Sequence, residues 1–136
     1  MKSTSKLVEG YKSIVDNSRN HGLVIDLPPA KNGTDLGPTA LELCVMGLSG
    51  CITTIFSVVA TNSKLEFDGI TAVIDADQPQ GAPTITKAVA DVTVISSEPE
   101  EKVKRIFDKT LNACPVEKLF EQAGISLEHN LVVKSS

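Results

Sequence analysis

Cys114 is the residue in this 136-residue sequence whose position most directly suggests chemistry. It stands just before Pro115, where a helix is expected to begin. As the N-cap of that helix, its sulfur would face unpaired backbone N–H groups and the positive end of the helix dipole, which lowers the pKa of a thiol. Glu117 lies three residues further on, as in a capping box, and its charge would partly oppose that effect. The alternative interpretation is that Cys114 is a small buried hydrophobic residue.

The other two cysteines lie in one long apolar segment. Cys51 follows Ser49 and Gly50, two small residues that leave room for a substrate or another backbone to approach its sulfur. Close helix packing is the alternative explanation for these small residues. Cys44 precedes Cys51 by seven residues, so a helix places both sulfurs on one face but about 10 Å apart along the axis. That separation is too large for an undistorted disulfide, and we expect Cys44 to belong to the core.

The elements that must position these cysteines follow from the hydrophobic pattern. Alternating or continuous apolar runs predict five strands, at residues 7–16, 22–27, 70–76, 85–95 and 125–133. Helical spacing and helix-start signals predict three helices, at residues 38–62, 97–111 and 115–123. The order ββ-α-ββ-α-α-β indicates an α+β fold with a mainly antiparallel sheet and a long central helix. No repeat or internal boundary is visible, so we expect a single domain over residues 1–136.

The long central helix has the length of a membrane span, because Leu43 to Ala60 contains no charged residue. Eighteen such residues reach the lower limit for a spanning helix. The segment contains several Gly, Ser and Thr residues, however, and no basic cluster flanks it. We therefore favour a helix that is buried nearly all round. At about 38 Å it would be longer than the sheet of a small domain is wide, so a second subunit is expected to cover it in a homodimer.

Composition excludes several classes of partner. The chain has 13 Lys and Arg residues against 17 Asp and Glu residues, a net charge of −4, and only 4% aromatic residues. Nucleic acids and anionic membranes are bound mainly by basic and aromatic surfaces, so neither is an expected partner. Three cysteines are too few for a disulfide scaffold, and no apolar segment of a secretory signal follows the N-terminus. We expect a cytoplasmic protein.

Neither a metal nor an organic cofactor is expected. Zinc sites are typically built from closely spaced Cys or His pairs, and this sequence contains no such pair. His21 falls in a turn and is expected to be exposed, whereas His129 falls on the apolar face of the last strand and is expected to be a core histidine. The glycines form no phosphate-binding fingerprint.

Two segments together resemble a known family. The run Gly37-Pro38-Thr39-Ala40-Leu41-Glu42-Leu43-Cys44-Val45-Met46-Gly47-Leu48-Ser49-Gly50-Cys51 is similar to the "GPSPxELLLxALGGC" helix of the OsmC/Ohr family. The run Ala113-Cys114-Pro115-Val116 is similar to the "CPV" cysteine that lies downstream in that family. Because the order of elements also agrees, the resemblance covers nearly the whole chain.

The resemblance implies a cytoplasmic, intertwined homodimer that reduces organic hydroperoxides. Cys51 would be the peroxidatic residue, whose thiolate attacks the O–O bond and becomes a sulfenic acid. Cys114 would be the resolving residue, which condenses with the sulfenic acid to a disulfide that an external dithiol then reduces. Low-pKa thiolates are the peroxide-sensitive ones, and a nearby thiol traps a sulfenic acid, so this chemistry is consistent with general principles.

The family also uses an arginine and a glutamate to activate the thiolate. Arg19 lies where the arginine of Ohr-type members falls, although a solvated turn arginine is the alternative. Ohr-type members place the glutamate ten residues before the cysteine, where this chain has Leu41; Glu42 is nine residues before Cys51, as in other OsmC-like branches. Nine residues turn a helix by about 900°, so Glu42 would point away from its own Cys51. It could act on the other subunit or assist the helix N-terminus.

Two further hypotheses stand beside the peroxidase. The same fold could be a non-catalytic module that binds a small apolar ligand at the dimer interface, with incidental cysteines. Ligand-dependent stabilisation with unreactive thiols would favour that alternative. A purely structural subunit would show neither reactivity nor a ligand.

Overall fold

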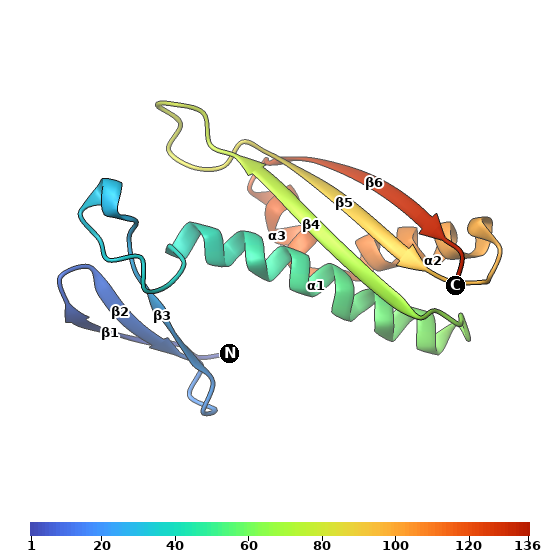
Figure 1. Cartoon of the computed structure of the whole chain (residues 1–136), viewed down its shortest axis with the longest axis horizontal. Coiled ribbons are helices and arrows are strands. Elements are labelled where there is room, and N and C mark those ends of the chain that lie inside the picture. Colours follow the sequence, from blue (N-terminus) through green and yellow to red (C-terminus); the bar gives the residue numbers. More distant parts are fainter. The chain divides into compact units, whose positions relative to one another are not determined.

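Three antiparallel strands precede the long helix in the computed structural model, which describes residues 1–136 (Figure 1). They are β1 (Thr4–Glu9), β2 (Lys12–Asp16) and β3 (Gly22–Ile25), and they pair in the order β1-β2-β3. The sequence predicted one strand over residues 7–16, and this is wrong, because a turn at Gly10 divides it into β1 and β2. Gly10 adopts a φ of +54°, a left-handed conformation that glycine allows without steric cost. The chain therefore has six strands rather than five.

The loop after β3 is organised around one buried carboxylate. It contains a short 3₁₀ helix, η1 (Pro29–Lys31). The carboxylate of Asp26 accepts hydrogen bonds from the Thr34 hydroxyl at 2.6 Å and from the backbone N–H groups of Leu27, Thr34 and Leu36. The hydroxyl of Thr34, followed by these N–H groups, lowers the pKa of Asp26 to about 2. These bonds fix the path of the chain toward the helix that carries the candidate site.

The long helix, α1 (Ala40–Asn62), begins within the first of two compact units, Met1–Cys44, and continues in the second, Val45–Ser136. The second unit contains β4 (Gly69–Asp77), β5 (Lys87–Ile95), α2 (Glu100–Ala113), α3 (Pro115–Gln122) and β6 (Ser126–Lys134). Figure 1 shows β4, β5 and β6 side by side. The β4–β5 pair is antiparallel, and the β5–β6 pair is parallel. Because parallel neighbours need a crossover connection, α2 and α3 lie between β5 and β6 in the chain.

The core of the second unit lies on one face of this sheet. Side chains of β5 alternate between buried and exposed, with Ala88, Ala90, Val92 and Val94 buried. Against this face pack residues of α1 and α2, namely Leu48, Ile52, Phe56, Ala60, Val103, Ile106 and Phe107. The opposite face remains exposed, including Val73 and Val132. The predicted α+β class and the predicted long helix are confirmed, and each predicted element of this unit lies within a few residues of its observed bounds.

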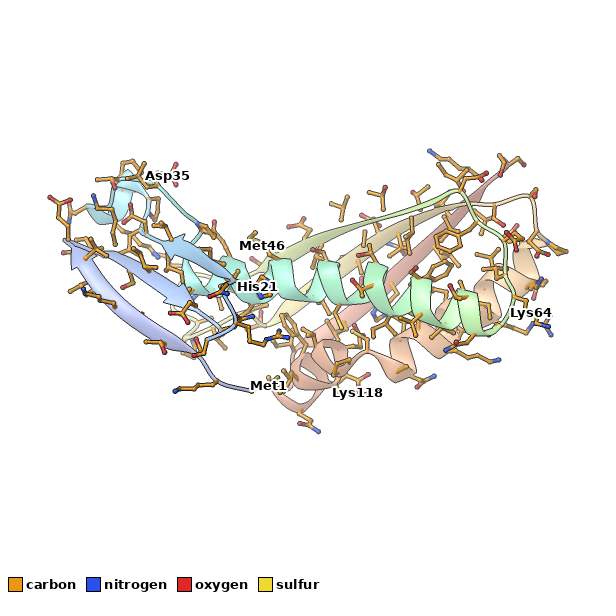
Figure 2. The ribbon with its side chains drawn as sticks, turned by 90° about the horizontal axis from the view of Figure 1, so that it is seen from below. Met1, His21, Asp35, Met46, Lys64 and Lys118 are labelled. Atoms are coloured by element: carbon orange, nitrogen blue, oxygen red, sulfur yellow. The ribbon has the colours of Figure 1, made fainter.

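Only one stripe of α1 is buried within the chain. The stripe consists of Leu48, Ile52, Phe56 and Ala60, and Figure 2 shows Met46 near the start of this part of the helix and Lys64 just beyond its end. Met46 and Val58 are about half exposed, at 54% and 50%. By length and composition alone α1 could cross a membrane, since an 18-residue window has a mean hydropathy of 2.0, and 22% of that window is buried. Met46 and Val58 therefore lie on a face of α1 that this single chain leaves uncovered.

Candidate functional site

Two cysteines from distant segments meet inside the second unit. Cys51 lies on α1, and Cys114 lies between α2 and α3, 63 residues later. The Cys114 thiol donates a hydrogen bond to Cys51 Sγ, and the two sulfur atoms are 2.7 Å apart. Both thiols are free. A disulfide between them would need little movement of the backbone, so the pair is a candidate redox site.

The break between α2 and α3 positions Cys114. Pro115 has no N–H and restricts the residue before it to extended conformations, so α2 cannot continue through Cys114. Cys114 accordingly has a φ of −76° and a ψ of 112°, and its N–H still donates to Thr110 O at 2.9 Å. Its sulfur caps α3 by accepting a hydrogen bond from Glu117 N at 3.4 Å. The predicted N-cap role of Cys114 is confirmed.

The predicted lowering of the Cys114 pKa is wrong. Its side chain is completely buried. Burial, and then the hydrogen bond to Cys51, raises the pKa of Cys114 to about 11. The N–H groups of Glu117 and Val116 act in the opposite direction but are outweighed, because desolvation disfavours the thiolate more than two weak hydrogen bonds favour it. Cys114 is therefore a neutral hydrogen-bond donor at neutral pH.

Cys51 has a different environment, because it is only partly buried. It packs at the edge of the core between Leu48 and Ile52, which are both fully buried. Ile55, one turn further along α1, also packs against that core. The surroundings of Cys51 are thus largely aliphatic, and Cys51 is the less buried residue of the pair.

The third cysteine does not belong to the site. Cys44 is exposed, so its predicted place in the core is wrong. It lies one helical turn before Leu48, the first buried residue of α1, and therefore before the part of the helix that the sheet covers.

Arg19 and Glu42 belong to the first unit, Met1–Cys44. Arg19 is exposed in the turn between β2 and β3, where its N–H donates to Asn17 Oδ1 at 3.0 Å. Glu42 forms a capping box, in which its carboxylate accepts from Thr39 N at 2.7 Å and its own N–H donates to Thr39 Oγ1 at 3.2 Å. The hydrogen bonds from Thr39 lower the pKa of Glu42. The action of Arg19 and Glu42 on Cys51 stays a prediction.

A buried pair next to Cys114 was missed in the sequence. Glu117 is 1% exposed, and its Oε1 lies 2.8 Å from Nε2 of His129 on β6. The sequence suggested a capping residue and a core histidine separately. Nothing in their spacing could indicate that they meet, because the packing of α3 on β6 brings them together.

Two cavities of the chain are lined by residues other than Cys51 and Cys114. One of about 520 Å³ lies between α2 and β6 and is lined by residues that include Lys104, Phe107, His129 and Asn130. A smaller one of about 290 Å³ adjoins the β2–β3 turn near His21. No group of three or more His, Cys, Asp or Glu side chains is arranged to hold a metal ion.

Residues 33–130, which include both cysteines of the pair, match the family model of OsmC-like proteins. The chain belongs to the OsmC-like family. The resemblance predicted from the helix before Cys51 and the Cys114-Pro115 pair is confirmed. A comparison with curated protein sequences found no match.

Solved structures of OsmC-like proteins share this fold along nearly the whole chain. An OsmC-like protein from Mycoplasma pneumoniae has a TM-score of 0.86 at 14% identity, over 98% of this chain and 96% of that one. An OsmC-like protein of unknown function from Vibrio cholerae has a TM-score of 0.79 at 11% identity, with 96% and 97% covered. An organic hydroperoxide resistance protein from Elizabethkingia anophelis has a TM-score of 0.71 at 16% identity, with 98% and 94% covered. At sequence identities this low, the structural similarity establishes a shared fold and nothing more.

Proposed function

We propose that this OsmC-like protein is a cysteine-dependent peroxidase that reduces organic hydroperoxides. The observation that carries the proposal is the 2.7 Å separation of the Cys51 and Cys114 sulfur atoms within the part of the chain that matches the family. Two structural neighbours, from Elizabethkingia anophelis and Legionella pneumophila, are organic hydroperoxide resistance proteins by name. A paired thiol is what a two-cysteine peroxidase needs to convert a sulfenic acid into a disulfide.

The environments of the two sulfurs support a division of roles. A peroxidatic sulfur must be reached by its substrate and must react as a thiolate. Cys114 meets neither condition, because it is completely buried and its pKa is raised to about 11. Cys51 is only partly buried and accepts the hydrogen bond from Cys114. We therefore assign the attack on the peroxide to Cys51 and the resolving step to Cys114.

The proposed cycle has three balanced steps. The Cys51 thiolate attacks one oxygen of the hydroperoxide, the O–O bond breaks, and the alkoxide takes up a proton and leaves as an alcohol. Cys51 becomes a sulfenic acid, two electrons more oxidised. The Cys114 sulfur then attacks Cys51 Sγ, the S–O bond breaks, and the hydroxyl group leaves with the Cys114 proton as water. An external dithiol reduces the resulting disulfide by thiol–disulfide exchange.

The surroundings of Cys51 support an organic substrate. Ile55 is only partly buried and offers an apolar surface to an alkyl chain one helical turn from Cys51, whereas Leu48 and Ile52 are buried beneath it. None of these side chains offers a polar partner to hydrogen peroxide. Arg19 and Glu42, from the same or the partner subunit of a cytoplasmic homodimer, would stabilise the thiolate and polarise the peroxide. These assignments belong to the proposal.

Cysteine replacements test the division of roles. Turnover of cumene hydroperoxide is measured with dithiothreitol as reductant, and Cys44→Ser serves as the matched control because Cys44 is exposed and outside the pair. We expect Cys51→Ser to reduce turnover to the uncatalysed background. We expect Cys114→Ser to accumulate a sulfinic acid at Cys51, seen by mass spectrometry as two added oxygen atoms, because nothing traps the sulfenic acid. Wild-type turnover by Cys51→Ser would contradict the proposal.

A further inference from the structure

Glu117 is a carboxylate buried in the core beside the cysteine pair. It lies in the first turn of α3 and is 1% exposed. Its Oε2 has no hydrogen-bond partner, and its Oε1 lies 2.8 Å from His129 Nε2 without the alignment of a good hydrogen bond. Burying a carboxylate is costly unless it is paired, and an apolar side chain could fill the same space. The cost suggests that Glu117 has a task besides packing.

Glu117 is also in direct contact with Cys114, the buried member of the cysteine pair. Its backbone N–H donates to Cys114 Sγ at 3.4 Å, and Cys114 Sγ lies 2.7 Å from Cys51 Sγ. The side chain of Glu117 contacts His129 on β6, while its backbone N–H group contacts the sulfur of the resolving cysteine. A shift of this residue would move the N–H group that fixes the position of the Cys114 sulfur.

His129, the residue that Glu117 contacts, is held in place by the sheet and by an aromatic neighbour. It lies in the middle of β6 and pairs with Ala90 of β5 in the parallel ladder. Its ring meets the ring of Phe107 edge to face, with centroids 6.4 Å apart. The side chain of His129 is 20% exposed and lines the cavity of about 520 Å³ between α2 and β6. The strand and the aromatic contact hold the ring in place, so Glu117 has a rigid partner.

We propose that Glu117 and His129 form a positioning pair that ties the first turn of α3 to β6 and so holds the Cys114 sulfur against Cys51 for the resolving step. The proposal rests on the proposed function for that step. In it the Cys51–Cys114 S–S bond forms, the S–O bond of the sulfenic acid breaks, and water leaves. A displacement of about 1 Å in reacting atoms can slow a step by about 100-fold, so a buried tie of this kind can control the rate.

The test separates the two steps in rapid-mixing experiments. The oxidation of Cys51 by cumene hydroperoxide and the closure of the disulfide are each followed in wild type, Glu117→Ala and Glu117→Gln. Glu121→Ala is the matched control, since Glu121 lies on the same helix in an exposed ion pair with Lys118. We expect Glu117→Ala to slow closure by about tenfold or more and to leave Cys51 oxidation within about twofold. Glu117→Gln keeps the shape and polarity of the side chain and should restore most of the closure rate.

Oxidised glutathione provides a second route to the same closure. It forms a mixed disulfide at Cys51 and releases one glutathione thiol, and Cys114 then displaces the second. If the hydroperoxide leaves Cys51 unchanged while glutathione drives closure, the proposed function fails and the positioning role is still measured. Wild-type closure by Glu117→Ala on both routes would overturn the positioning role. An equal loss in both steps would also overturn it, because that pattern indicates general structural damage.

A double variant, in which apolar residues replace both Glu117 and His129, keeps the test valid if Glu117→Ala does not fold. Removing one member of a buried polar pair leaves the other without a partner and is strongly destabilising, whereas replacing both with apolar residues of similar volume is often tolerated. Glu117→Leu/His129→Leu removes the contact between the two side chains and leaves neither polar group alone in the core. We expect the same selective slowing of closure in this double variant, and closure at the wild-type rate would overturn the proposal.

Discussion

At the residue scale, the Cys114 thiol shows how burial can outweigh a helix N-terminus. Its sulfur does cap α3, as the Cys114-Pro115 pair predicts. The position was predictable because proline ends one helix and begins the next. The pKa of Cys114 was not predictable, because the sequence does not show that the core covers this sulfur completely. The thiol that looked reactive from the sequence is protonated at neutral pH.

The raised pKa of Cys114 predicts a specific loss of stability in alkali. Its value in the folded chain, about 11, lies above the ordinary 9.0, so the folded state holds this proton more tightly than the unfolded state. This contribution to stability is fully present below about pH 9 and disappears as the pH rises through about 11. We expect the free energy of unfolding of the reduced protein to fall more steeply over this range in wild type than in Cys114→Ser, which keeps an N-cap oxygen. Denaturant titrations at several pH values measure this free energy. The same pH dependence of the free energy of unfolding in wild type and Cys114→Ser would contradict the prediction.

At the element scale, the periodicity of apolar residues predicted most of the fold. It located α1, α2, α3 and the strands of the second unit, because each has one buried face with a regular repeat. It missed the β1–β2 turn, where only Gly10 with a φ of +54° interrupts an otherwise strand-like run. The parallel pairing of β5 and β6 follows from the crossover through α2 and α3.

The candidate site could be predicted only in part at this scale. The cysteines were found by type and by resemblance, but their 2.7 Å approach depends on how α1 packs against the α2–α3 junction. The Glu117–His129 contact likewise depends on the packing of α3 on β6. Gly37, which belongs to the segment that resembles the family, is required to be glycine for a steric reason, because a Cβ there would clash with the backbone oxygen of Val24. Such close approaches come from tertiary structure, which a single sequence does not display.

At the scale of the whole molecule, α1 leaves apolar surface uncovered. Met46 and Val58 are about half exposed, and a Cβ added at Gly47 or Gly50 would meet nothing within 4 Å. Large exposed apolar surfaces of this kind are typical of contact sites. A second copy of the chain packed on α1 would cover it, and this is the homodimer included in the proposed function.

A charge introduced on α1 tests the homodimer. Val58→Glu and Val132→Glu make the same change at side chains that are each 50% exposed, the first on α1 and the second on β6. An unpaired carboxylate buried at an interface costs about 3 kcal/mol or more, which corresponds to about 100-fold in Kd. We expect sedimentation equilibrium to give twice the chain mass of 14.4 kDa for wild type and Val132→Glu, and weakened association for Val58→Glu. A wild-type protein that sediments as single chains would contradict the homodimer.

The proposed peroxidase activity is best tested by following the three thiols after one equivalent of an organic hydroperoxide. Reduced wild-type protein is treated with cumene hydroperoxide, with hydrogen peroxide in parallel, and analysed by thiol titration and non-reducing peptide mapping. We expect rapid loss of two thiols, a linked peptide that joins Cys51 to Cys114, and an unmodified Cys44, with the organic peroxide reacting faster. Survival of all three thiols on prolonged exposure would contradict the proposed activity, and would favour a module of the same fold that binds a small apolar ligand.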